Sequence, residues 1–121
     1  MRIDHGVRCE DDPGLVDRLV RDQIALTMCP LSNVKLRVFP DLAHHPLKKL
    51  LDAGLCATVN SDDPAYFGGY IGENYRATAA ALELTAGELV ALADNAVRAA
   101  FLPDDAKAAL LARIRSAAAQ A

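Results

Sequence analysis

Residues 55–64 read LCATVNSDDP, a short apolar run that ends in turn-forming residues and two adjacent carboxylates. Such a run, bounded by turn formers, is typical of a strand buried on both faces. A second run of this kind covers residues 24–28 and stops at Cys29-Pro30, and a third opens the chain at residues 1–4. The sequence therefore predicts three short strands, each followed by polar residues.

Helical patterns separate these strands. Asp12 and Pro13 form an N-cap and first-turn pair, which predicts a helix over residues 13–22. A loop rich in Ser, Asn and Pro is expected after the second strand. Pro46 then opens a shorter helix, which Gly54 closes. Because strands and helices alternate from residue 1 to residue 59, we predict an α/β fold with right-handed βαβ units and a parallel sheet.

The rest of the chain is predicted to be helical. Thr85 and Glu88 have the spacing of a capping box and precede an apolar periodic segment that runs to Phe101. Pro103 starts a last helix with apolar residues at four-residue steps. The expected architecture is thus about three parallel strands followed by C-terminal helices.

Composition and charge restrict the partners. The 121 residues carry a net charge of −3, with no cluster of basic residues and no run long and apolar enough to span a bilayer. We therefore expect neither a nucleic acid nor a membrane as a partner. The odd number of cysteines, three, and their spacing suit a reducing compartment, so the cytoplasm is the expected location.

A sheet of three short parallel strands would have open edges and uncovered apolar faces. A complete small domain is not expected to tolerate such edges. We therefore expect residues 1–121 to be the C-terminal part of a longer barrel domain whose N-terminal part is absent from this chain.

Candidate catalytic residues follow the three predicted strands, and loops at the carboxyl ends of parallel strands converge on one face. His5 suits a general base, a metal ligand, or a histidine satisfied by the backbone. Asp62 and Asp63 would point in opposite directions on an extended backbone, so one could bind a metal and the other a ligand proton. The alternative is an aspartate N-cap ahead of Pro64.

Other polar and aromatic residues have less specific patterns. His44 and His45 are predicted to be structural, with His45 at a helix N-cap. Cys29 is not expected to be a nucleophile, because Pro30 follows it and no helix N-terminus is expected there to lower the pKa of its thiol. The aromatic and glycine residues at positions 66–70 fit either a mobile lid over a planar ligand or a turn with packed rings.

Four motifs stand in order along nearly the whole chain: RIDHGVR at 2–8, CPLSN at 29–33, HPL at 45–47 and NSDDPAYFGGY at 60–70. Together they resemble the adenosine and adenine deaminase family. The last motif, which ends in Tyr-Phe-Gly-Gly-Tyr, is more similar to the adenine deaminase branch.

This resemblance implies the C-terminal portion of a TIM barrel and a zinc-dependent hydrolase that converts adenine, a small-molecule purine, to hypoxanthine and ammonia. It implies that Asp62 is a zinc ligand, that Asp63 binds the purine ring at N7, and that His5 orients or deprotonates the attacking water. Zinc acidifies bound water, and imidazole and carboxyl groups suit the other two roles.

The family's remaining zinc ligands and its glutamate proton donor have no counterpart in these 121 residues. The isolated chain is therefore expected to bind no zinc and to be inactive. Two alternatives stay open, adenosine deaminase and a non-catalytic α/β binding module.

Overall fold

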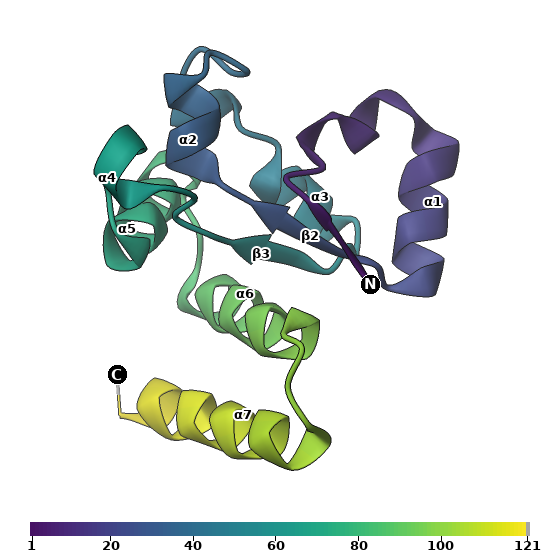
Figure 1. The fold of residues 1–121 in the computed structure, drawn as a ribbon, viewed down its shortest axis with the longest axis vertical. Helices are drawn as coiled ribbons and strands as arrows, with labels where there is room; N and C mark the ends of the chain where they lie inside the picture. Colours follow the sequence, from purple (N-terminus) through teal and green to yellow (C-terminus); the bar gives the residue numbers. More distant parts are fainter. Residues whose placement is uncertain (121) are drawn as a thin grey trace.

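The computed structural model describes residues 1–120 and contains one parallel sheet in the order β1-β2-β3 (Figure 1). The strands are β1 (Arg2–Asp4), β2 (Ala25–Met28) and β3 (Ala57–Val59). Their register aligns Ile3 with Leu26 and Leu26 with Ala57. The helical elements are η1 (Val7–Asp11), α1 (Pro13–Asp22), α2 (Pro30–Lys35), η2 (Leu42–His44), α3 (Leu47–Asp52), α4 (Pro64–Phe67), α5 (Ile71–Leu82), α6 (Ala86–Ala99) and α7 (Asp104–Ala119).

Local capping chemistry places the helices between the strands. The Asp12 carboxylate accepts a hydrogen bond from the Leu15 N–H at 3.2 Å, and Pro13 occupies the first turn of α1. This satisfies an N–H that the helix start leaves unpaired. Gly54 follows α3 with φ 96°, which only glycine adopts readily. The α/β class, the parallel sheet and the helix over residues 13–22 are confirmed.

The segment after β2 differs from the prediction. A loop was expected there, but residues Pro30–Lys35 form the helix α2, with Cys29 at its N-cap. Proline stops a preceding strand, yet it is also well suited to the first turn of a helix, where its missing N–H leaves no hydrogen bond unmade. Pro30 therefore both ends the segment of β2 and begins α2.

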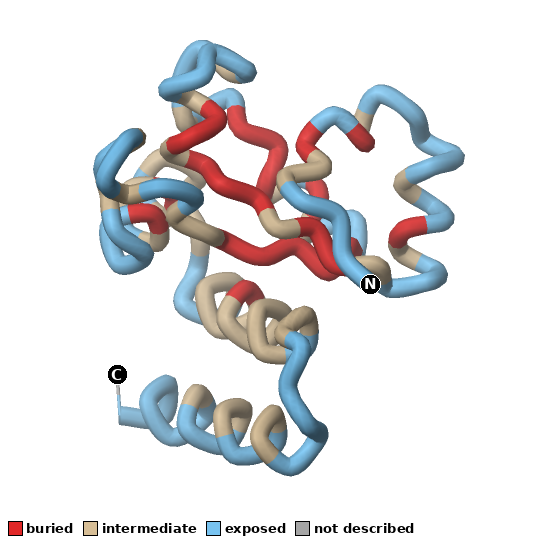
Figure 2. The backbone as a smooth tube through the Cα atoms, viewed as in Figure 1, coloured by how far each residue is buried: buried red, intermediate tan, exposed pale blue. Residues whose placement is uncertain are grey.

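The apolar core lies around strands β2 and β3. Every residue of β3 is buried, and β2 is nearly as enclosed, whereas all three residues of β1 are exposed (Figure 2). Ile3 on β1 is 40% exposed. The core cluster consists of Val7, Cys9, Leu19, Leu26, Met28, Leu47, Leu50, Leu55, Ala57, Val59 and Leu92.

Helices α6 and α7 form a second and third layer on one side of the sheet. Helix α6 packs against β3, where the Asn95 amide donates to the Ala57 carbonyl at 2.9 Å, and α7 lies beyond α6 (Figure 1). The predicted capping box is present, since Thr85 and Glu88 exchange both hydrogen bonds. Among residues 1–120, no helix is long and apolar enough to cross a membrane.

Candidate active site

An open cavity of about 500 Å³ lies at the carboxyl edge of the sheet. Strands β1 and β2 and the loop that follows β3 contribute to it, because the carboxyl ends of the three parallel strands meet at this edge. Its lining is Arg2, Asp4, His5, Thr27, Cys29, Asn60, Ser61, Asp62 and Ile71. The predicted convergence of the three polar loops is therefore confirmed.

His5 leaves β1 in the left-handed backbone region. Its φ is 59°, and its N–H donates to the Thr27 carbonyl at 2.9 Å, which prolongs the pairing of β1 with β2. Gly6 also has a positive φ, 75°, and a Cβ there would lie 2.7 Å from the side chain of Leu26. A left-handed non-glycine residue is uncommon and is stabilised only by its surroundings. The turn directs the imidazole of His5 into the cavity.

Asp62 reaches the same cavity from the loop after β3. Its φ of 56° is left-handed, which corrects the expectation that Asp62 and Asp63 lie on an extended backbone. Its Oδ2 accepts a hydrogen bond from Ser32 Oγ at 2.8 Å and lies 3.8 Å from His5 Nε2. The fold therefore brings together His5 and Asp62, two of the three predicted site residues.

Asp63 lies at the N-terminus of α4 instead. Its carboxylate accepts a hydrogen bond from the Tyr66 N–H at 3.2 Å, so the alternative role of helix N-cap is realised by Asp63. The side chain is exposed, and Asp63 is not among the residues that line the cavity. The structure does not place it beside His5 and Asp62.

Cys29, for which the sequence predicts no nucleophilic role, lies next to His5 and Asp62. Ligand atoms of His5, Cys29 and Asp62 all lie within 4.8 Å of one another. Imidazole nitrogen, sulfur and carboxylate oxygen are the ligand types that zinc takes in proteins, so these groups fit a zinc site in kind.

The thiol of Cys29 is nevertheless not activated. A helix N-terminus does follow Cys29, contrary to the prediction, but burial, followed by the nearby Asp62 and Asp4 carboxylates, raises the pKa of the thiol to about 11. A raised thiol pKa disfavours the thiolate, which is the nucleophilic form. That Cys29 is not a nucleophile stays a prediction.

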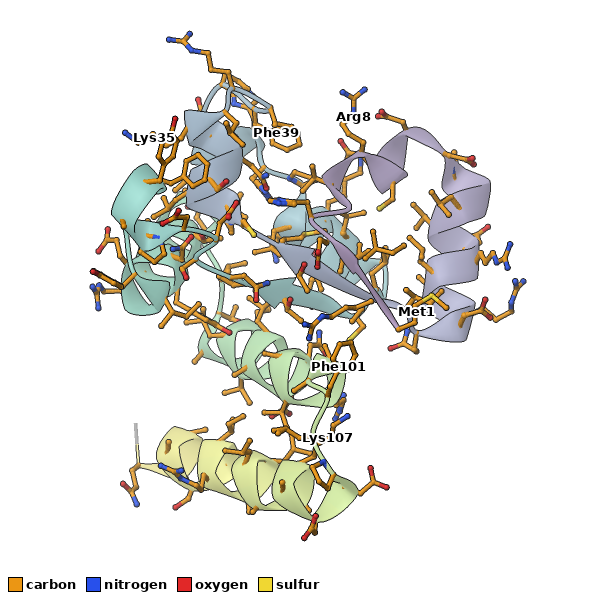
Figure 3. All side chains as sticks on the ribbon, viewed as in Figure 1. Met1, Arg8, Lys35, Phe39, Phe101 and Lys107 are labelled. Carbon is orange, nitrogen blue, oxygen red and sulfur yellow. The ribbon has the colours of Figure 1, made fainter. Side chains whose placement is uncertain are left out.

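His45 is buried behind the cavity. Its Nδ1 accepts a hydrogen bond from the Leu47 N–H at 3.2 Å, as a capping side chain would, although the backbone N-cap of α3 is Pro46. Its Nε2 lies 3.0 Å from Asn33 Oδ1, and burial lowers the pKa of the imidazole to about 4. The ring packs against Phe39, whose side chain is labelled in Figure 3, with the two ring centroids 5.1 Å apart. His44 faces solvent and pairs with Asp41.

Sequence reasoning gives no role to Ser32 and Asn33, which contact Asp62 and His5 respectively. Asn33 Nδ2 lies 3.2 Å from His5 Nδ1, and Asn33 is 2% exposed. Both residues lie in the CPLSN motif after the second predicted strand, and that position is the available signal. Their contacts with residues of the other strands depend on the tertiary fold.

The aromatic segment at positions 66–70 covers the end of α4 and the residues that connect it to α5. Tyr66 packs edge-on against Phe67, and Tyr66 and Tyr70 are 80% and 75% exposed. Gly69 has φ 79°, and a Cβ there would collide with Leu31. These contacts are compatible with both interpretations of the segment, a turn with packed rings and a mobile lid over a planar ligand.

Known proteins resemble this chain throughout. A family model described as adenosine deaminase matches residues 1–117. Adenine deaminase from Cupriavidus necator is 60% identical over 113 residues, which is 93% of this chain and 32% of the relative. The chain thus spans about a third of the length of the curated relatives it matches.

Solved structures agree with this match. The crystal structure of adenine deaminase from Arthrobacter aurescens superposes with a TM-score of 0.93 at 50% identity, over 95% of this chain and 35% of that protein. An amidohydrolase from Burkhoderia ambifaria with bound Zn gives a TM-score of 0.88 at 28% identity, over 98% and 34% of the two chains. The three parallel strands and their helices correspond to a portion of a TIM barrel. The chain belongs to the adenosine deaminase family.

Proposed function

We propose that the protein in which residues 1–121 occur is a zinc-dependent aminohydrolase that converts adenine to hypoxanthine and ammonia. The observation that carries this proposal is the meeting of His5 and Asp62 in one cavity, at a distance of 3.8 Å, in a chain 60% identical to an adenine deaminase. An imidazole beside a carboxylate at the carboxyl edge of a parallel sheet suits metal-assisted hydrolysis.

Asp62 is the proposed zinc ligand of this chain. Ser32 donates to its Oδ2 and so fixes the orientation of the carboxylate, as outer hydrogen bonds do for metal ligands. One carboxylate does not hold zinc alone, so the other ligands would come from the segment that the relatives have and this chain does not. When bound, zinc would lower the pKa of a water molecule and make it a nucleophile at neutral pH.

His5 and Asp63 are the proposed partners of the water and the purine. The imidazole Nε2 of His5 faces the Asp62 carboxylate across the cavity and would hold the attacking water. Asp63 would bind the purine ring at N7. Its position at the N-terminus of α4, adjacent to Asp62, leaves its carboxylate at the exposed rim of this loop.

The product would enter purine salvage in the cytoplasm. The three cysteines are all buried and free, which suits a reducing compartment. Adenosine is a second candidate substrate, because the family model that matches residues 1–117 is described as adenosine deaminase.

The decisive experiment measures zinc content and the turnover of adenine and adenosine by the intact protein. We expect about one zinc ion per active site and deamination of adenine in preference to adenosine. Asp62→Asn should lose both zinc and turnover. Asp17→Asn, an equivalent change at an exposed position of α1, should keep both. Preferential deamination of adenosine would favour the second candidate, and full activity of Asp62→Asn would contradict the metal assignment.

A further inference from the structure

A backbone N–H determines which nitrogen of His45 carries a proton. The Leu47 N–H donates to His45 Nδ1 at 3.2 Å, and a backbone amide can only donate. His45 Nδ1 must therefore be an unprotonated acceptor. Because burial lowers the pKa of His45 to about 4, the ring is neutral near pH 7 and carries its single proton on Nε2.

The proton on His45 then fixes the orientation of the Asn33 amide. His45 Nε2 lies 3.0 Å from Asn33 Oδ1, so the N–H donates to the amide oxygen. The opposite orientation of the amide would set an NH₂ group against an N–H group. Since His45 and Asn33 are 4% and 2% exposed, water is not available to relieve such a clash. The NH₂ group of Asn33 must therefore point toward His5.

The orientation of the Asn33 amide in turn determines which nitrogen of a neutral His5 carries the proton. Asn33 Nδ2 lies 3.2 Å from His5 Nδ1 and can only donate there. We infer that Asn33 and His45 are positioning residues that hold neutral His5 in the tautomer with its proton on Nε2, the nitrogen that faces Asp62 across the cavity. Hydrogen bonds from the start of α3 thus select the tautomer of a residue at the end of β1.

This tautomer has a consequence that rests on the proposed function. A neutral His5 with its proton on Nε2 offers the cavity a hydrogen-bond donor and no free lone pair. It would hold the attacking oxygen by donating to it, and it would not remove a proton from it. Of the two roles expected for His5, orienting the water is the one this network supports.

Nitrogen NMR of the imidazoles tests the tautomer directly. We would label the intact protein with ¹⁵N histidine and record two-bond proton–nitrogen correlations at alkaline pH. Histidine-to-glutamine variants at positions 5 and 45 assign the signals. We expect His5 and His45 both to be protonated on Nε2. A His5 ring protonated mainly on Nδ1 would overturn the inference.

Asn33→Asp tests whether Asn33 sets the tautomer. Aspartate has the same shape but, when ionised, offers only acceptors, so the proton of His5 should move from Nε2 to Nδ1. Ser32→Ala is the matched control, since it removes a neighbouring contact to Asp62 and leaves the His45–Asn33–His5 chain intact. Its His5 signal should stay in the Nε2–H pattern.

If Asn33→Asp folded and kept His5 protonated on Nε2, the role of Asn33 would be refuted. If this variant did not fold, the wild-type spectrum would still decide the tautomer. The spectra are read whether or not adenine is deaminated, so a failure of this inference and a failure of the proposed function are distinguishable.

Discussion

His5 Nε2 lies 3.8 Å from Asp62 Oδ2, although the two residues follow strands that are not neighbours in the sheet. Strand β2 lies between β1 and β3, so the two side chains meet across the end of the middle strand. Both residues have a left-handed backbone, with φ of 59° and 56°. Such conformations cost free energy for residues with a Cβ and occur often at functional sites.

Gly6→Ala should destabilise the protein and disturb the site. The φ of Gly6 is 75°, and the added Cβ would meet Leu26, which is fully buried. The left-handed conformation alone costs roughly 1–2 kcal/mol for alanine. Urea unfolding measures this loss. Gly87→Ala, in the first turn of α6, adds a Cβ that would make only an ordinary contact with the Thr85 side chain at 3.9 Å, and it should instead stabilise by up to about 1 kcal/mol. Equal stability of Gly6→Ala and wild type would contradict the steric argument.

Asp63 variants should separate helix capping from purine binding. Asp63→Ala removes the cap of α4 and should cost about 1 kcal/mol of unfolding free energy, whereas Asp63→Asn keeps a capping oxygen. Both variants should retain zinc. Both should also lose roughly 2 to 4 kcal/mol of transition-state stabilisation for adenine, if Asp63 makes a charge-assisted hydrogen bond to the purine. Wild-type turnover of Asp63→Asn would leave Asp63 with a capping role alone.

His45 should make the stability of the protein depend on pH in the acidic range. Its folded-state pKa of about 4 is below the ordinary 6.5, so the unfolded chain binds more protons between these values. The contribution is fully present above pH 6.5 and is lost progressively as the pH falls to about 4, by about 3 kcal/mol in total. Unfolding free energies of wild type and His45→Gln, compared across this range, should converge as the pH falls. Parallel curves would count against a buried neutral imidazole.

The ionised Glu88 side chain should stabilise the protein, and this stabilisation should be lost in strongly acidic solution. The hydrogen bond from Lys48, at 2.6 Å, is the main cause that lowers the pKa of Glu88 from 4.5 to about 2. The stabilisation is complete above pH 4.5 and disappears as the pH falls through about 2. Glu88→Gln keeps an acceptor for the Thr85 N–H and loses the ion pair. For Glu88→Gln, the free energy of unfolding should therefore decrease less steeply than that of the wild type as the pH falls from 4.5 to about 2. The same decrease in both proteins would refute the assignment.

Those features of the fold that depend on neighbouring residues could be predicted from the sequence. Asp12-Pro13 and the Thr85–Glu88 pair are capping signals within four residues, and both helices begin where these signals place them. Helix α2 was missed because Pro30 has two structural meanings, the end of a strand and the start of a helix.

The candidate site could be predicted only in part. His5 and Asp62 follow predicted strands, so their convergence follows from parallel topology. Their left-handed backbones could not be predicted, because that region is mainly glycine's and no local signal marks it at a histidine or an aspartate. The hydrogen bonds of Asn33 with His5 and His45 join segments far apart in the sequence, so only the folded chain reveals them.

The attachment of α7 has a consequence for local opening of the structure. Within Asp104–Ala119 no residue is buried, and this helix packs mainly on α6, while α6 itself packs on the sheet. Undocking α7 would therefore uncover little apolar surface and would leave the strands paired. Amide hydrogens of α7 should exchange with solvent deuterium through such openings, and those of β2, at the centre of the sheet, should exchange only when the whole structure unfolds.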